Sequence, residues 1–170
     1  MILKNIENIL AKVNEPIANT GKRIAGLLLI MMTSIVLLQV FYRYLLGSPL
    51  TWTDELSSYL MIYMTYLCLP LIYLTDQNIA MTFLVEKIKG KRISHLVMFF
   101  VHIFALLTIA VWIYFGWAFF LKGNVMANSL PFKMYYIYLV PPLLFCITLL
   151  QVMQKIISEL NNFINYQKIN

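Results

Sequence analysis

The ionisable residues whose spacing most suggests a role lie in a short polar stretch between two long apolar runs. Arg43 closes the first run, and Asp54 and Glu55 open the second. Residues 47–49 read Gly-Ser-Pro, which indicates a turn, and Thr51 to Asp54 has the spacing of a capping box that starts a helix. We predict that Arg43 pairs with Asp54 or Glu55 across a helical hairpin. An exposed pair contributes only about 0–1 kcal/mol, so its role would be to fix the hairpin or to contact a partner.

Two histidines and two cysteines are the other side chains with chemical potential. His95 and His102 would lie on one face of one helix, about 10 Å apart along it, so they cannot bind one haem from opposite sides. We expect His95 at the membrane–water interface and His102 hydrogen-bonded in the interior of the protein. Cys68 and Cys146 fall inside apolar runs and match no metal-binding spacing. The sequence contains no nucleophile–base pair and no phosphate-binding loop motif, so we expect no enzyme, no cofactor and no metal site in this chain.

The elements that position these residues are four apolar runs without a single Lys, Arg, Asp or Glu. Of the 170 residues, 61% are hydrophobic and 12% are charged, whereas soluble domains carry roughly a quarter charged residues. Because about 20 apolar residues cross the hydrocarbon core as a helix, each run is long enough to span a membrane. The sequence therefore predicts an all-α integral membrane protein with four transmembrane helices. Its single membrane domain, 1–170, is expected to comprise an interfacial helix and linker (1–23), transmembrane helices (24–45, 53–74, 93–121 and 131–153), a cytoplasmic loop (75–92) and a cytoplasmic amphipathic tail (154–170).

Basic residues are concentrated on one side of the predicted spans. Ten of the thirteen Lys and Arg residues fall there, against Arg43, Lys122 and Lys133 on the other side. Cytoplasmic segments of membrane proteins carry an excess of Lys and Arg, so this bias predicts that the N-terminus and the C-terminus are both cytoplasmic. The net charge of +6 then reflects topology and contacts with anionic membrane lipids, and indicates no nucleic-acid partner.

Residues 1–15 are patterned as a helix but are too polar to span a membrane. Apolar residues recur at helical spacing, with charged and amide side chains on the other face, until Pro16 interrupts the pattern. This predicts an N-terminal amphipathic helix lying in the cytoplasmic membrane interface, with a frayed terminal helix as the alternative. The apolar positions are Ile2, Leu3, Ile6, Ile9, Leu10 and Val13.

Four tyrosines in the second span fall at intervals that place them on one helix face. They are Tyr59, Tyr63, Tyr66 and Tyr73. A tyrosine hydroxyl in hydrocarbon requires a partner, so we expect this tyrosine stripe to face protein and not lipid. Two interpretations stay open, namely packing within the chain's own bundle and a docking face for another subunit. Pro70, on the same face, favours a kink, because it leaves the carbonyl of Tyr66 without its helical donor.

No Lys, Arg, Asp or Glu occupies the middle of any predicted span. Ion-coupled transporters and proton pumps keep such residues within the membrane, because charge there is costly and is retained for function. The residues therefore favour a membrane protein that works by binding other proteins. A self-sufficient small oligomeric transporter and a membrane-anchor subunit of a respiratory complex are the alternatives.

The hairpin also carries a family resemblance. The run Gln39 to Tyr44 (QVFYRY), followed by Ser48 to Leu56 (SPLTWTDEL), resembles the DctQ-type small membrane subunit of TRAP transporters, the tripartite ATP-independent periplasmic transporters. Leu130-Pro131 and Pro141, around Tyr135–Val140, are similar to the fourth-helix pattern of that family. After the second span this chain reads Thr-Asp-Gln-Asn-Ile, where the family often has a basic residue and a histidine.

The resemblance implies a division of labour among three proteins in the bacterial inner membrane and periplasm. A periplasmic substrate-binding protein delivers an organic acid to a large elevator-type subunit, which holds the substrate and sodium sites. The small subunit braces that scaffold and helps to present a docking surface. Sialic acid and dicarboxylates are both compatible substrates. The hairpin and partner-interface candidates in this chain are Arg43, Trp52, Asp54 and Glu55, and the partner-facing candidates are the four residues of the tyrosine stripe.

Overall fold

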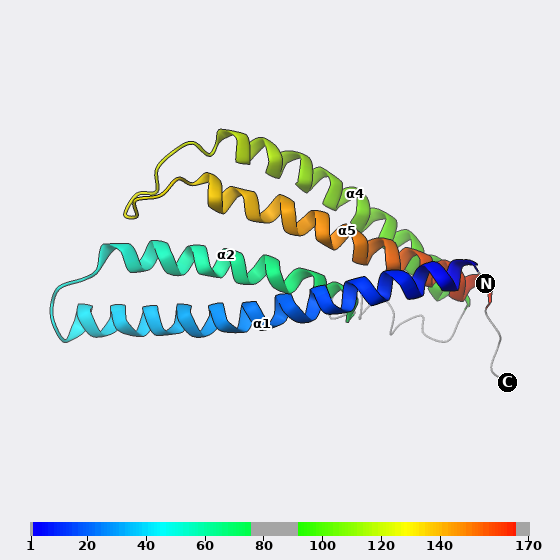
Figure 1. The fold of residues 1–170 in the computed structure, drawn as a ribbon, viewed down its shortest axis with the longest axis horizontal. Coiled ribbons are helices and arrows are strands. Elements are labelled where there is room, and N and C mark those ends of the chain that lie inside the picture. The colour runs from blue at the N-terminus through cyan, green and yellow to red at the C-terminus, as the bar shows by residue number, and fades with distance from the viewer. Residues whose placement is uncertain (1, 76–91, 166–170) are drawn as a thin grey trace.

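The computed structural model describes residues 2–75 and 92–165, and within them the chain is a bundle of four helices (Figure 1). They are α1 (Ile2–Tyr44), α2 (Thr51–Leu74), α4 (Arg92–Lys122) and α5 (Tyr135–Ile164). Each is long and apolar enough to cross a membrane. This confirms an all-α architecture with four potential spans. Residues 76–91 of the expected loop and the end of the tail beyond residue 165 lie outside the described residues.

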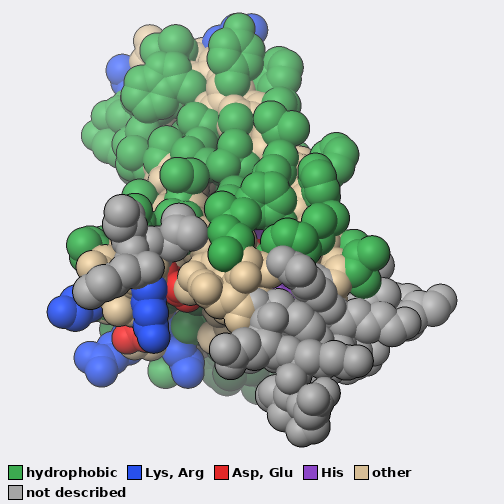
Figure 2. Space-filling view, turned by 90° about the vertical axis from the view of Figure 1, so that its right-hand side faces the viewer, with side chains coloured by type: hydrophobic (Ala, Val, Ile, Leu, Met, Phe, Trp, Pro, Cys, Tyr) green, Lys and Arg blue, Asp and Glu red, His purple; other side chains and the backbone are tan. Residues whose placement is uncertain are grey.

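The helices form two hairpins, α1–α2 and α4–α5, joined mainly through α5. Helix α5 packs along α4 and also contacts both α1 and α2. Figure 1 shows that α1 begins and α5 ends at the same end of the bundle, which we call the termini end. Residues 45–50 and 123–134 connect the helices at the opposite end, which we call the loop end. Figure 2, viewed from the termini end, shows hydrophobic side chains over the upper part, while acidic and most basic side chains gather below.

Helix α1 continues through Pro16 without a break, so the interruption expected there was wrong. Contacts on both sides hold the helix together: Asn14 bonds to α5, and Gly21 lies against the backbone of α2. A proline removes one helical hydrogen bond, and these contacts to neighbouring helices keep the chain helical across the gap. The helix has 43 residues, which is about 65 Å and well beyond the ~30 Å of the hydrocarbon core. An interfacial location of its first part stays a prediction.

Helix α5 begins at Tyr135 and not near Pro131 as expected, and it runs on to Ile164. The preceding segment is a compact loop instead, in which Met134 donates to the carbonyl of Val125 (2.8 Å) and Ala127 to that of Phe132 (2.9 Å). Because α5 runs on to Ile164, most of the expected tail (154–170) is a continuation of the same helix. Pro141 and Pro142 lie inside α5, and Gly116 of α4 makes room for Pro142, whose ring would lie 3.3 Å from a Cβ at that glycine.

The connection between α1 and α2 contains the expected turn but not the expected cap. Gly47 has a φ of +60°, a left-handed conformation that favours glycine. Leu50 occupies the N-cap position and makes no side-chain cap bond. Thr53 instead donates back to the carbonyl of Leu50 at 2.7 Å. The capping box from Thr51 to Asp54 is therefore wrong, because the helix begins at Thr51 itself.

Candidate functional site

Glu55 is the centre of a hydrogen-bonded junction at the loop end. Its Oε1 accepts bonds from the Tyr59 hydroxyl (2.5 Å) and from the backbone N–H of Asn128 (2.9 Å), and its Oε2 accepts from the N–H of Ser129 (2.5 Å). Glu55 and Tyr59 are one helical turn apart, so both face the same side of α2. The carboxylate thereby ties the beginning of α2 to the loop 123–134. We call Glu55, Tyr59, Asn128, Ser129 and Met134 the loop-end junction.

Apolar side chains pack around the Tyr59 side of the junction. The Tyr59 side chain is only 8% exposed and forms a cluster with Ala127 and Ile137. Its ring meets Phe132 edge-on at 5.5 Å between centroids, and its hydroxyl lies 3.1 Å from the sulfur of Met134. The loop 123–134 is therefore packed against α2, and we call it the loop platform. Its exposed surface carries Val125, Met126, Ser129, Pro131 and Lys133.

Arg43 does not form the predicted ion pair. Among the described residues, no guanidinium nitrogen of Arg43 lies within 4.0 Å of a carboxylate oxygen of Asp54 or Glu55. Asp54 accepts a bond from Gln39 Nε2 at 2.6 Å, while the Arg43 guanidinium lies 5.7 Å from the ring centre of Tyr44. The prediction failed because Glu55 is engaged by a loop 73 residues away in sequence. Trp52 is exposed in the first turn of α2, and its role at a partner interface stays a prediction, as do those of Arg43 and both carboxylates.

The tyrosine stripe faces the chain's own α4–α5 hairpin. Besides Tyr59, the Tyr63 hydroxyl donates to the carbonyl of Tyr136 (3.1 Å), and the Tyr66 ring meets Phe145 edge-on. Tyr73 is buried and bonds to His102. Of the two interpretations, packing within the bundle is the one that the structure supports. Tyr59 and Tyr73 have little surface left for a partner, whereas Tyr63 and Tyr66 are half-buried, so a partner contact there stays a prediction.

Both histidines join α4 to its neighbours. His102 is 1% exposed, and its Nδ1 lies 2.6 Å from the Tyr73 hydroxyl. This confirms the expectation of a hydrogen-bonded interior histidine. His95 Nδ1 lies 2.7 Å from Glu159 Oε2 on α5, near the termini end. The two side chains therefore fasten α4 to α2 and to α5.

Sequence reasoning missed a second polar contact, at the termini end. The Asn14 amide donates to the Leu150 carbonyl (3.2 Å) and to Gln154 Oε1 (2.6 Å), and it accepts from Gln151 Nε2 (3.2 Å). Asn14 and Gln151 are both fully buried. The available signal was that Asn14 follows Leu10 and precedes Ala18 by one helical turn each, so it lies on the apolar face. We call Asn14, Gln151 and Gln154 the amide cluster.

Comparison with known proteins identifies the family. Residues 32–162 match the family model described as the DctQ component of tripartite ATP-independent periplasmic transporters. The match covers most of the chain, including the outer part of α1, both hairpin connections and the loop-end junction. A search of curated proteins found no match to this chain. The chain belongs to the DctQ family, the small membrane component of TRAP transporters.

Proposed function

We propose that this chain is the non-catalytic small permease subunit of a sodium-coupled TRAP transporter in a bacterial inner membrane. It braces the scaffold of a large elevator-type subunit and helps to dock the periplasmic substrate-binding protein. The large subunit holds the sodium ions and the organic acid, either sialic acid or a dicarboxylate. Both termini of the small subunit lie in the cytoplasm, in keeping with the strong bias of basic residues toward one side of the predicted spans.

The observation that carries the docking role is the loop-end junction. Two loop N–H groups converge on the Glu55 carboxylate, and such charge-assisted bonds are stronger than neutral ones. The loop therefore offers a pre-formed surface to a partner, which lowers the cost of ordering it on binding. With the termini in the cytoplasm, this surface faces the periplasm, where the substrate-binding protein approaches.

The bracing role is supported by how the helices are fixed to one another. The tyrosine stripe and His102 supply hydrogen bonds and ring contacts between the hairpins, and His95 bonds α4 to α5 within the second hairpin. The spans between these contacts carry no charge in their middle, so they offer no site of the kind that moves ions across a membrane. A bundle held in this way suits a static support better than a moving element.

Uptake of the organic acid into proteoliposomes tests the proposal. The vesicles contain the large subunit and this chain, and the binding protein is added at increasing concentration. We expect Glu55→Gln to require several-fold more binding protein for half-maximal uptake, because the amide replaces one acceptor oxygen by a donor. Asp54→Asn is the matched control, since the neighbouring carboxylate contacts Gln39 and not the loop, and it should shift the titration less than Glu55→Gln does.

Two results would contradict the proposal. If the large subunit and the binding protein transport as fast without this chain, it provides no essential brace. If Glu55→Gln and the unmodified chain give the same titration, the loop platform does not dock the binding protein.

A further inference from the structure

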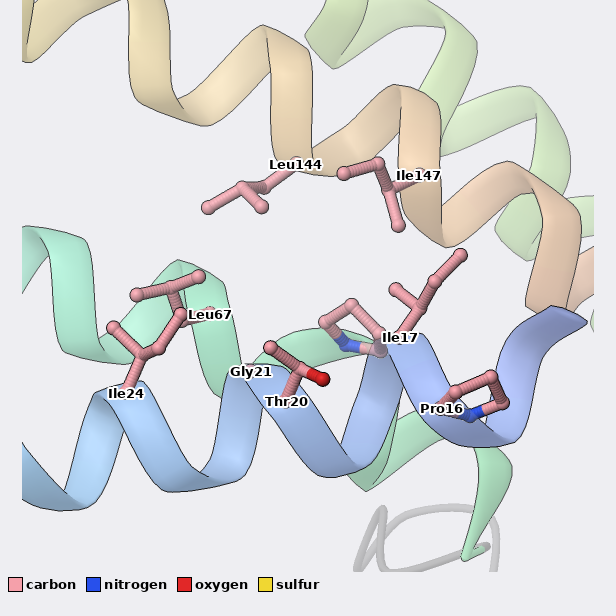
Figure 3. Close-up of a pocket in the computed structure, with 9 residues that line it drawn as sticks. Pro16, Ile17, Thr20, Gly21, Ile24, Leu67, Leu144 and Ile147 are labelled. Atoms are coloured by element: carbon pink, nitrogen blue, oxygen red, sulfur yellow. The ribbon is translucent and has the colours of Figure 1, made fainter.

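A groove of about 350 Å³ lies where α1, α2 and α5 meet (Figure 3). Leu144 and Ile147 extend from α5 toward the side chains of α1 and α2. Thr20 supplies the single hydroxyl among the nine lining residues. The groove is lined by Pro16, Ile17, Thr20, Gly21 and Ile24 of α1, Leu67 and Pro70 of α2, and Leu144 and Ile147 of α5.

The groove exists because α1 is fixed at two points with short side chains between them. Toward the termini end Asn14 binds α5, and Gly21 touches α2 so closely that an added Cβ would lie 2.6 Å from the Leu67 carbonyl oxygen. Between these points Pro16 and Thr20 are too small to fill the space. Pro16, Thr20 and Ile24 are exposed while Pro70 is buried, so the groove opens along this face of α1.

The size of the groove restricts what can occupy it. A helix is 10–12 Å across, so a 10 Å length needs on the order of 800–1,100 Å³, well above the groove's volume. Cavities lined by aliphatic side chains stay dry and take up apolar ligands. A flexible hydrocarbon chain therefore fits, and the bilayer supplies such chains at high concentration.

The helical spacing of α1 places one cation on the face where the groove opens. Arg23 follows Thr20 by three residues and Pro16 by seven, so it belongs to the same open face, and it is exposed. Long side chains on a helix lie over the preceding turn, which brings the guanidinium toward Thr20. Lys22 is also exposed, but its position falls on the opposite face of α1, as does that of Glu15.

We propose that this groove is a specific binding site for an anionic membrane phospholipid. One acyl chain lies between Ile24, Leu67 and Leu144, and the phosphate lies beside Arg23 and the Thr20 hydroxyl. Charge complementarity at the rim selects an anionic headgroup over a zwitterionic one, because each basic residue near the surface contributes about 1 kcal/mol toward anionic lipid. The site does not depend on the transport role proposed above.

The test uses the complex of this chain with its large subunit, purified in mild detergent and titrated with phosphatidylglycerol or phosphatidylcholine. Native mass spectrometry counts the bound lipids. We expect Arg23→Gln to weaken phosphatidylglycerol binding about fivefold, while Lys22→Gln, the matched control, changes it less than twofold. Ile147→Trp, which fills the groove, should abolish the site for both lipids. A phosphatidylglycerol with a diazirine on its acyl chain should label the peptide that contains Leu144 and Ile147.

Two outcomes would overturn the site. Equal weakening by Arg23→Gln and Lys22→Gln would mean diffuse attraction of lipid to a basic surface. A second result would be absence of lipid label from the α5 peptide, together with crosslinks to the large subunit from a photoreactive amino acid placed at position 144. It would mean that a partner side chain fills the groove. If Ile147→Trp does not assemble, the two charge variants and the photolabel still decide.

Discussion

The two ends of the bundle are fastened by different chemistry. At the loop end, the Glu55 carboxylate accepts hydrogen bonds from two backbone N–H groups of one loop. At the termini end, the side-chain amides of the amide cluster exchange bonds between α1 and α5. The loop end lies within the family match, whereas Asn14 precedes it.

The difference follows from what each backbone leaves unpaired. A loop exposes N–H groups that lack helical acceptors, so one carboxylate serves two of them. In two packed helices the backbone N–H groups are already paired, so side chains must supply the donors that join them. The amide cluster is also less complete, because Gln151 Oε1 has no hydrogen-bond partner in the described part of the chain. We therefore expect the termini end to be more sensitive to substitution.

The largest effect is expected from Asn14→Leu, which removes three hydrogen bonds and leaves the buried Gln151 amide without a partner. The free energy of unfolding should fall by about 2–3 kcal/mol, measured by titrating the detergent-solubilised chain with a denaturing detergent. Asn19→Leu, at an exposed position of the same helix, is the control. Equal losses in both variants would show that the amide cluster does not fasten α1.

Gly21→Ala tests the contact that adjoins the amide cluster. The new methyl group would lie 2.6 Å from the Leu67 oxygen, so the hairpin must open, at a cost of about 1–3 kcal/mol. Gly26→Ala adds the same group where nothing lies within 4 Å, and it should be neutral or stabilising, because alanine favours helix. The same denaturing titration compares the two. A neutral Gly21→Ala would contradict close packing of α1 on α2.

Glu55→Gln probes the loop end directly. Because Asn128 and Ser129 are exposed, water replaces part of the lost interaction, and the loss should be about 1–2 kcal/mol. Hydrogen exchange of these two amides should become about tenfold faster. Asp54→Asn should not alter them. Unchanged exchange in Glu55→Gln would mean that the loop holds its shape without the carboxylate.

Tyr63→Phe should have the smallest effect. It removes one hydroxyl that bonds to the Tyr136 carbonyl, and single interhelical bonds in membranes average about 0.6 kcal/mol. Tyr114→Phe, on the exposed side of α4, supplies the reference in the same denaturing titration. A loss larger than that of Asn14→Leu would reverse the order of sensitivity between the two ends.

The sequence predicted what depends on composition and local period. Charge-free runs specified four spans, and the spacing of the four tyrosines specified one protein-facing stripe. Gly47 also specified its turn. Each of these features is decided by residues within a few turns of one another, which is the range over which a sequence pattern carries structural information.

Two of the failures involve contacts between residues far apart in sequence. Nothing near Glu55 indicates that Asn128 and Ser129 would be its partners, so the local cation Arg43 was the natural choice. The continuity of α1 through Pro16 depends on α2 and α5, and the late start of α5 depends on hydrogen bonds within the loop before it. The contacts of Glu55 and of Asn14 appear only once the hairpins are placed against each other.

The packing of α5 along the other three helices has a consequence for biogenesis. A membrane protein is inserted in chain order, so α1, α2 and α4 enter the bilayer before the helix that unites them has been made. Until then, the amide of Asn14 and the hydroxyl of Tyr63 lack their hydrogen-bond partners, which lie on α5. A nascent chain that stalls before Tyr135 therefore presents unpaired polar groups to lipid, a mark by which quality-control proteases could recognise an unfinished subunit.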